Sequence, residues 1–286
     1  MRLIHPGITL CLILLVAGSF AGRWSAFGDA LAVVRPVVAG GLALWLLPRL
    51  KPVWAVLPGL VLAGFALISV AVPFVTPAAP GPVSLYQKNL SFRMTDPAPL
   101  LADILAVNPD VITLQEVTEA HRLGVMQALA ARYPTQGFCP FAGVGGTAVL
   151  ARWPAAGPLI CPQTKGATVL PLAMPQGRIT VVALHLHWPF PYGQRAQVEA
   201  LLPGLAGLSG PVLVAGDFNM VPWGWPLTAV AQATRTQRAG PAQASFYIGG
   251  WAPVAIDHVL APGGGAVLRR DPLGSDHLGL VAQVWP

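Results

Sequence analysis

The run Val-Leu-Val-Ala-Gly-Asp-Phe-Asn, residues 212–219, carries the clearest structural signal in this chain. Its first four residues are apolar and mostly branched, which predicts a buried strand. Asp217 and Asn219 follow at the end of that strand, and side chains two positions apart in extended backbone point to the same side. An acid and an amide are therefore presented together where a buried strand ends.

The same placement of polar side chains recurs elsewhere in the chain. Polar residues lie at or near the ends of other strand-like runs, namely Asn89, Glu116, His185, His187, Asp257, Asp276 and His277. The ends of neighbouring strands gather at one edge of a sheet. We therefore expect several carboxylates, two amides and two or three imidazoles to meet there.

Carboxylates packed at one edge would repel one another and raise each other's pKa unless a cation lay between them. Carboxylate, amide and water oxygens suit Mg²⁺, Mn²⁺ or Ca²⁺ rather than zinc. Neither a Cys-x-x-Cys nor a His-Glu-x-x-His motif occurs in the sequence. A divalent cation beside His and Asp can stabilise the charge on a phosphoryl group while these residues transfer protons and orient water.

Each of these residues also has an ordinary structural explanation when taken singly. Glu116 is compatible with a surface or capping acid, and Asn89 with a turn residue. His185 or His187 alone is equally compatible with a buried, hydrogen-bonded histidine. His121 lies on a predicted helix rich in small and polar residues, so we expect it to be solvated. The combination, rather than any one residue, indicates a site.

The rest of the globular part predicts a mixed α/β fold. Strand-like runs outnumber helical ones by nearly two to one, which favours two packed sheets flanked by helices. Glycine- and proline-rich stretches at 134–145, 153–177 and 236–253 are expected to be long loops that carry specificity. Cys139 and Cys161 fit either a disulfide or two separate buried thiols.

Five short motifs carry a family resemblance. They are, in chain order, Asn89, Leu114-Gln115-Glu116, Gly216-Asp217-Phe218-Asn219, Ile256-Asp257-His258-Val259 and Ser275-Asp276-His277. Together they resemble the endonuclease/exonuclease/phosphatase superfamily, whose fold is that of deoxyribonuclease I. The likeness covers about residues 82–286. It implies a four-layer α/β/β/α sandwich that hydrolyses a phosphate ester with a divalent metal, usually Mg²⁺.

The resemblance also implies roles for the individual residues. Glu116 would be the principal metal ligand, with Asn89 and Asp276 nearby. Asp217 and Asn219 would position the attacking water and the phosphate.

The histidines have implied roles of their own. His277 would lie next to the scissile phosphate, held in its tautomer by Asp257. His185 matches a position from which the leaving oxygen could be protonated, and His187 is the second candidate for that role.

The amino-terminal residues 1–76 predict a membrane region. The chain has 286 residues, 54% of them hydrophobic and 10% charged, which excludes a disordered chain and disfavours an entirely soluble one. Three apolar stretches, at 7–22, 30–47 and 53–75, predict three spans, although a cleaved signal peptide is an alternative for the first. Arg35 and Pro36 interrupt the second stretch. Residues 77–82 predict a stiff tether to a catalytic domain at 83–286.

Orientation follows from the basic residues in short loops. Three spans place Arg2, Arg49 and Lys51 on one side, opposite Arg23, which is offset by Asp29. This predicts a multi-pass inner-membrane protein with its globular domain in a periplasm or its equivalent. A membrane region joined to this domain resembles a bacterial, YafD-like subgroup of the superfamily.

The function that we expect is a membrane-anchored, metal-dependent phosphoesterase, and more specifically a phosphodiesterase. Its substrate could be nucleic acid, a nucleotide or a phospholipid headgroup, and the lipid bilayer is its other partner. After residue 80 the net charge is only +2, without a basic, aromatic-interleaved stretch, which disfavours a duplex nuclease. The alternative is a catalytically silent module that binds a phosphorylated ligand on the same fold.

Overall fold

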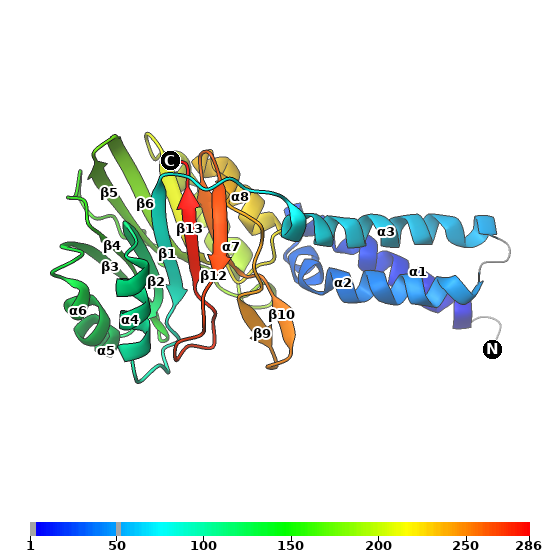
Figure 1. The fold of residues 1–286 in the computed structure, drawn as a ribbon. Coiled ribbons are helices and arrows are strands. Elements are labelled where there is room, and N and C mark those ends of the chain that lie inside the picture. The colour runs from blue at the N-terminus through cyan, green and yellow to red at the C-terminus, as the bar shows by residue number, and fades with distance from the viewer. Residues whose placement is uncertain (1–3, 50–52) are drawn as a thin grey trace.

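The computed structural model describes residues 4–49 and 53–286. A β sandwich forms one end of the molecule, and a bundle of three helices extends away from it (Figure 1). The bundle consists of α1 (Ile4–Gly18), α2 (Ala26–Leu46) and α3 (Val53–Val75). Short 3-10 turns, η1 (Ala21–Arg23) and η2 (Leu47–Arg49), follow α1 and α2.

Two segments of the bundle have the length and apolar composition needed to cross a membrane. They are Ala26–Arg49, with 24 residues, and Val53–Val75, with 23. The first predicted span also forms a helix, but its 15 residues are shorter. At 1.5 Å per residue it extends about 22 Å, less than the ~30 Å of a typical hydrocarbon core.

The sequence predicts an interruption of the second apolar stretch at Arg35 and Pro36, but the structure has a continuous helix there. Helix α2 continues through Pro36, so Arg35 lies in the middle of the helix, where it is buried. Its Nε donates to Ser19 Oγ (3.0 Å) and its Nη1 to Ser69 Oγ (3.1 Å), and the guanidinium stacks on Phe20. The charge is thus partnered within the bundle. Arg2 and Lys51, on which the predicted orientation partly depends, lie outside the described residues.

The sandwich contains two large sheets and a separate hairpin. The first sheet has the order β12-β13-β1-β2-β4-β3 and the second β5-β6-β7-β11-β8, while β9 and β10 form the hairpin. The strands of the first sheet are β1 (Val83–Asn89), β2 (Val111–Val117), β3 (Thr135–Ala142), β4 (Gly145–Ala151), β12 (Gly265–Arg269) and β13 (Leu280–Val284). Those of the second sheet and the hairpin are β5 (Ala167–Met174), β6 (Gly177–His185), β7 (Val212–Asp217), β8 (Gln237–Arg238), β9 (Phe246–Ile248), β10 (Ala252–Val254) and β11 (Asp257–Ala261).

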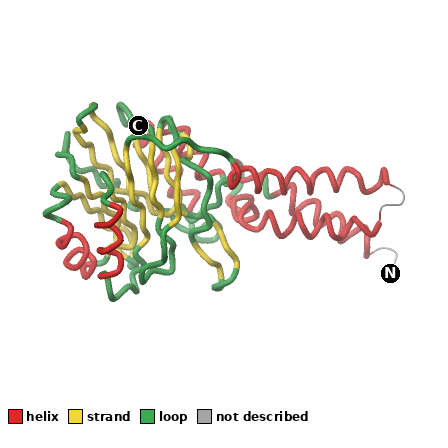
Figure 2. Tube along the Cα trace, viewed as in Figure 1, coloured by secondary structure: helices red, strands yellow, loops and turns green. Residues whose placement is uncertain are grey.

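Helices cover the outer face of each sheet (Figures 1 and 2). The first sheet is covered by α4 (Ala98–Val107) and by the continuous helical segment α5 (Glu119–His121), η3 (Arg122–Met126) and α6 (Gln127–Leu129). The second is covered by α7 (Gln194–Ala206) and α8 (Trp225–Thr234). Separate apolar clusters fill the space between the sheets and beneath each helical layer. The predicted four-layer α/β/β/α sandwich is confirmed.

All three predicted loops contain strands, and the stretch at 236–253 includes β8, β9 and the start of β10. β3 and β5 lie within the stretches at 134–145 and 153–177, despite Pro140 and Pro171. Each of them is the outermost strand of its sheet. An edge strand tolerates a proline because one side of it needs no ladder partner.

The strand register brings the expected side chains to one edge. β1 and β2 are parallel with Asn89 opposite Gln115, and β6 and β7 are parallel with His185 opposite Asp217. β11 runs antiparallel to β7, so that Asp257 lies opposite Asp217. Both sheets therefore contribute side chains to the same end of the sandwich.

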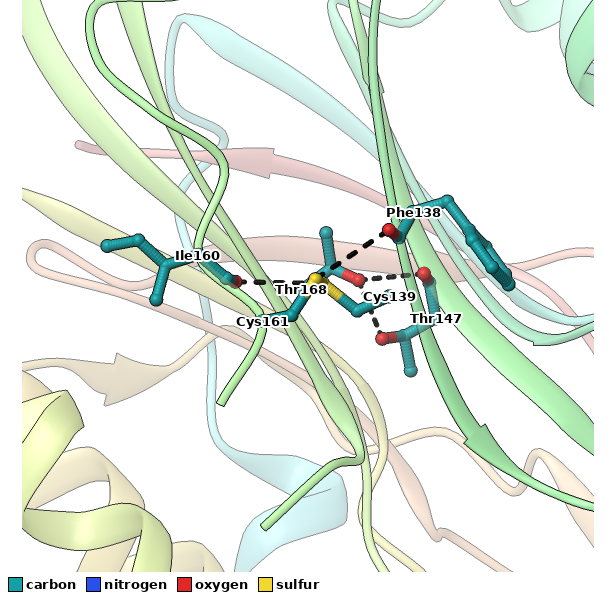
Figure 3. Close-up of a disulfide and its surroundings, with 6 residues drawn as sticks. All are labelled: Phe138, Cys139, Thr147, Ile160, Cys161 and Thr168. Carbon is teal, nitrogen blue, oxygen red and sulfur yellow. Dashed lines mark hydrogen bonds between the residues drawn. A yellow bond between two sulfur atoms is a disulfide. The ribbon is translucent and has the colours of Figure 1, made fainter. Parts of the chain in front are cut away.

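Cys139 and Cys161 form a disulfide (Figure 3). It joins β3 of the first sheet to the segment that precedes β5 of the second. Nearby, the hydroxyls of Thr147 and Thr168 share a hydrogen bond of 2.7 Å, which also connects the two sheets. Of the two possibilities that the sequence allows, the structure has the disulfide, and Cys11 is the free cysteine.

Candidate active site

A pocket of about 310 Å³ lies at the edge where the two sheets meet. Six of the eight predicted site residues line it, and they are Glu116, His185, Asp217, Asn219, Asp276 and His277. The other two, Asn89 and Asp257, are buried behind it and are hydrogen-bonded to residues of the lining. His187 also lines the pocket. The structure thus brings together all the residues that the sequence suggested.

Asn89 connects the carboxylates of the two sheets. Its Nδ2 donates to Glu116 Oε1 (3.2 Å) and to Asp217 Oδ2 (3.0 Å). Its Oδ1 accepts from the backbone N–H of Ser91 (2.9 Å), which fixes the orientation of the amide. Two carboxyl groups are consequently held on either side of one amide group.

Glu116 occupies an irregular position in its strand. It has a φ of 54°, and the pairing of β2 with β4 shifts register between Leu114 and Val117. A positive φ is uncommon for a residue with a side chain and marks strained backbone at functional sites. The bulge turns the carboxylate toward Asn89, and the backbone N–H of Phe92 donates to Glu116 Oε2 (2.8 Å).

His121 supports this bulge and is not solvated, contrary to the sequence expectation. It is buried, with Nδ1 3.1 Å from the carbonyl oxygen of Glu116 and Nε2 3.1 Å from that of Met94. Thr118 caps the short helix through its side chain, which accepts from the backbone N–H of His121. His121 therefore anchors this helix to the backbone next to the site.

Asp257 and His277 form a buried pair. Asp257 Oδ2 lies 2.8 Å from His277 Nδ1, and Asp257 Oδ1 accepts from Gln87 Nε2 (2.7 Å). Asp257 also lies beside Ser245, whose Oγ accepts from its backbone N–H (3.1 Å). The carboxylate thus holds a proton on Nδ1 and leaves Nε2 of His277 facing Asp217, 3.7 Å from its Oδ2.

The electrostatic environment gives the buried groups unequal proton affinities. Burial alone lowers the pKa of His277, but the carboxylates of Asp257 and Asp217 outweigh burial and raise that pKa to about 9. Burial raises the pKa of Asp217. Burial opposes ionisation of Asp257 as well, yet His277 and the hydrogen bonds around it hold its pKa below the usual value.

The two histidines at the end of β6, His185 within the strand and His187 just after it, lie against one aromatic ring. The ring centroid of Phe141 is 5.1 Å from that of His185 and 4.9 Å from that of His187. His185 Nε2 lies 3.6 Å from Asp217 Oδ2, and its Nδ1 is buried without a partner. Burial, aided by the charge of His277, lowers the pKa of His185 to about 3, so this imidazole is neutral near neutral pH.

Asn219 completes the wall beside Asp217. Its backbone N–H donates to Asp217 Oδ1 (2.8 Å), and its Nδ2 donates to the carbonyl of Leu186 (2.8 Å). Gln194, at the start of α7, donates to the backbone carbonyls of His187 (2.6 Å) and Phe218 (2.9 Å). These contacts fix the loops that follow β6 and β7 relative to each other.

Three supporting residues were not identified from the sequence: Gln87, Gln194 and Lys88. Lys88 is fully buried, and its Nζ donates to the carbonyl oxygens of Pro272 (2.7 Å) and His277 (2.6 Å). Burial lowers its pKa to about 8. The sequence offered one signal for Lys88, which is its place inside the predicted strand Val-Ser-Leu-Tyr-Gln-Lys-Asn, residues 83–89. In a half-buried strand a lysine is expected on the exposed face, between apolar residues that face the core.

The donor atoms of the pocket fit a hard divalent cation. Glu116, Asp217 and Asp276 provide carboxylate oxygens, and no cysteine is among the described residues that line the pocket. Ligand atoms of Asp217, Asp257 and His277 also lie within 4.8 Å of one another. Asp257 and His277 are already hydrogen-bonded to each other, so the carboxylates on the Glu116 side suit a metal better.

Two helix-covered sheets with carboxylates, amides and paired histidines at their common edge define a phosphoesterase-like fold. Residues 89–277 match the Endonuclease/Exonuclease/phosphatase family, and the chain belongs to that family. No curated protein matches the sequence.

Solved structures share the fold at low sequence identity. The human Nocturnin catalytic domain, with a bound sulfate anion, is 22% identical with a TM-score of 0.56, over 72% of this chain and 95% of that one. Beta toxin from Staphylococcus aureus, with bound magnesium ions, is 12% identical with a TM-score of 0.54, over 71% and 99%. Sphingomyelinase C from Streptomyces griseocarneus is 18% identical with a TM-score of 0.50, over 73% and 100%.

Proposed function

We propose that this chain is a membrane-anchored, divalent-metal-dependent phosphodiesterase. The observation that carries the proposal is the convergence on one pocket of two groups: the Asp257–His277 pair and the carboxylates of Glu116, Asp217 and Asp276. A packing role does not explain so many buried polar groups, since each one needs a hydrogen-bond partner to avoid a cost of about 1–3 kcal/mol, which an apolar side chain would not incur.

The residues of the pocket would divide the work of hydrolysis. Asp217 and Asn219 would orient the attacking water and the phosphate, because both face the space next to His277. Asp257 keeps the Nδ1 proton of His277 in place, so Nε2 is the atom that meets the phosphoryl group or the water. His185, buried and neutral, suits the donation of a hydrogen bond to the leaving oxygen, and His187 is the more exposed alternative.

A metal would be held by Glu116 and Asp276, with Asn89 beside them. When bound, it would neutralise charge that develops on the phosphoryl oxygens. Mg²⁺ is our first candidate, and Mn²⁺ or Ca²⁺ has the same oxygen preference. The beta toxin with bound magnesium ions has the same fold, which supports this choice.

The cellular location that we propose is the inner membrane, with residues 83–286 on its outer, periplasmic side and residues 77–82 as the tether. Segments Ala26–Arg49 and Val53–Val75 support the anchoring. The Cys139–Cys161 disulfide supports the oxidising side, because structural disulfides persist there and are rare in the cytosol.

The proposal is tested by hydrolysis of bis-p-nitrophenyl phosphate by the purified protein, with Mg²⁺ or Mn²⁺ and with EDTA. We expect metal-dependent release of nitrophenol that is lost in Glu116→Gln and in His277→Ala. Circular dichroism of each variant controls for folding. A folded variant that retains a near-normal rate would contradict the assignment, and tight metal binding without turnover by the unchanged protein would favour the silent binding module.

A further inference from the structure

The mouth of the pocket is built from two segments rich in aromatic residues. One is Trp-Pro-Phe-Pro-Tyr, residues 188–192, and the other is the β9–β10 hairpin. The ring centroids of Trp188 and Phe246 are 5.9 Å apart, and that of Phe246 is 4.8 Å from that of His277. The two segments therefore meet directly over the proposed catalytic histidine.

The outer side of this mouth is apolar and exposed. Its exposed side chains are Phe190 (55% exposed), Tyr192 (69%) and Trp251 (81%), together with Tyr247 and Ile248. We call these five residues the apolar rim. Large aromatic side chains gathered at an entrance mark an interaction surface, and Trp and Tyr in particular favour the interface between lipid and water.

The apolar rim is continuous with the membrane bundle. The ring of Phe190 packs edge-on against that of Phe27, which is the second residue of α2, with 6.1 Å between centroids. Arg195 in the first turn of α7 donates to the backbone carbonyls of Gly22 and Arg23 in η1, at 2.7 Å each. The pocket loop and the end of the bundle are thus fastened to each other.

This continuity sets the level of the pocket mouth relative to a bilayer. With α2 and α3 as spans, η1 and the first turn of α2 lie where the helices leave the hydrocarbon core. Trp24, between η1 and α2, is 76% exposed at this level. The β9–β10 hairpin projects from the sandwich on the side of the bundle (Figure 1). The rim would therefore rest on the membrane surface.

The charge of the pocket distinguishes among phosphodiesters. No lysine or arginine is among the described residues that line it. Nucleic acids bring many phosphates, and the proteins that bind them neutralise these with basic side chains. A single headgroup phosphate brings one charge, which a bound metal and His277 would match.

We infer that the substrate is a membrane lipid whose headgroup phosphodiester enters the pocket directly from the bilayer surface on which the apolar rim rests. This inference depends on the proposed function, since it names the substrate of the same site. In the reaction, the oxygen of water forms a bond to phosphorus and one ester P–O bond breaks. The released oxygen takes up a proton, so the products are a phosphomonoester and an alcohol.

The test uses the full chain in vesicles of phosphatidylethanolamine and phosphatidylglycerol, with bis-p-nitrophenyl phosphate as a soluble substrate on the same preparation. We expect phosphomonoester or free alcohol to be released from the lipids. Trp251→Ser should lower lipid turnover about tenfold, since it removes one buried aromatic contact with the bilayer, while the soluble diester is cleaved as before. Leu268→Ser, which removes an exposed apolar side chain of β12 that belongs neither to the pocket lining nor to the apolar rim, should change neither rate.

The outcomes separate the two levels of the proposal. If the unchanged protein hydrolyses neither the lipids nor the soluble diester, the proposed function itself is contradicted. Cleavage of the soluble diester without cleavage of either lipid would overturn the lipid inference alone. Cleavage of an oligonucleotide that weakens steeply with salt, with no effect of Trp251→Ser, would replace the lipid with nucleic acid.

A second measurement does not depend on turnover. In a Cys11→Ser background, a fluorophore sensitive to polarity is attached to Trp251→Cys or, as a control, to Leu268→Cys. The remaining cysteines are paired in the disulfide. We expect a blue-shifted emission in vesicles for position 251 and none for position 268. Equal emission at the two positions would show that the rim does not touch the bilayer.

Discussion

Nδ1 of His277 lies 2.8 Å from Oδ2 of Asp257, although the two residues come from a loop and a strand 20 positions apart. The pair is almost completely buried. Its geometry assigns the tautomer of the histidine and directs the other ring nitrogen toward the pocket. The carboxylate therefore acts on the reaction through the imidazole rather than on the phosphate itself.

The first prediction concerns this pair. Asp257→Asn keeps the size of the side chain but removes the charge that holds the Nδ1 proton, so turnover should fall about 10²–10⁴-fold, the range typical of lost acid–base function. Asp257→Glu retains a carboxylate and should recover part of the loss. The measurement is kcat for bis-p-nitrophenyl phosphate at saturating metal. Wild-type turnover by the Asn variant would remove Asp257 from the mechanism.

The second prediction concerns His121, which contacts the backbone of Glu116 from outside the pocket. His121→Ala should loosen the bulge that aims the Glu116 carboxylate. The Mg²⁺ concentration for half-maximal activity should then rise about 10-fold, as is typical when a group supporting a metal ligand is lost. Activity at saturating Mg²⁺ should largely recover. An unchanged metal dependence would show that the bulge holds its shape without the imidazole.

A third prediction follows from buried His258, whose Nε2 lies 2.8 Å from the carbonyl oxygen of Met220. Burial lowers its pKa to about 4, whereas an unfolded histidine titrates near 6.5. Between these values the unfolded chain binds more protons, so stability falls as the pH drops below about 6.5. From about pH 7.5 to about pH 5 the loss from this residue is on the order of 2 kcal/mol.

His258→Gln tests this pH dependence, because the amide keeps a hydrogen-bond donor and does not titrate. Denaturant unfolding at the two pH values should show a smaller acid-induced loss for the variant than for the unchanged chain. If the two proteins lose stability in parallel, the acid sensitivity arises elsewhere.

The fourth prediction concerns the disulfide. Cys139 and Cys161 close a loop with a sequence separation of 22 residues. Such a loop contributes about 3 kcal/mol in the chain-entropy account, so dithiothreitol should lower the unfolding temperature markedly. A double Cys→Ser variant should unfold at the lower temperature with or without reductant. A reductant effect of the same size in that variant would point to a cause other than this bond.

Much of the site could be read from the sequence because its residues follow apolar strands directly. The Val212–Ala215 run and its acid and amide need no tertiary information. The polar residues that follow such runs indicated the pocket, and the family resemblance carried by the five motifs implied the four-layer sandwich. The edge strands β3 and β5 were not predicted, because Gly137, Pro140 and Pro171 are residue types that strands disfavour. β3 pairs with β4, and β5 pairs with β6 and through isolated bridges with Ala155 and Ile160, so their strand conformation depends on neighbouring backbone, which is a tertiary condition.

Local sequence also could not decide which polar side chains are buried. His121 carries no local signal that separates a solvated group from one that is hydrogen-bonded to distant carbonyls, and Lys88 carries only its place inside a strand-like run. Met94, Pro272 and the backbone of His277 supply them here, and they are brought near only when the loops pack. Burial of a polar group depends on such partners, since it is costly without them.

Hydrophobic pattern and side-chain direction are local properties, so the apolar helices, most of the strands and the acids, amides and histidines at their ends could be predicted without a structure. Three contacts depend on how the chain packs: Asn89 joins Glu116 to Asp217 across two sheets, Cys139 pairs with Cys161, and Phe190 contacts Phe27 at the base of the bundle. Each of these contacts joins segments far apart in the chain, and their distances are set by how the layers pack.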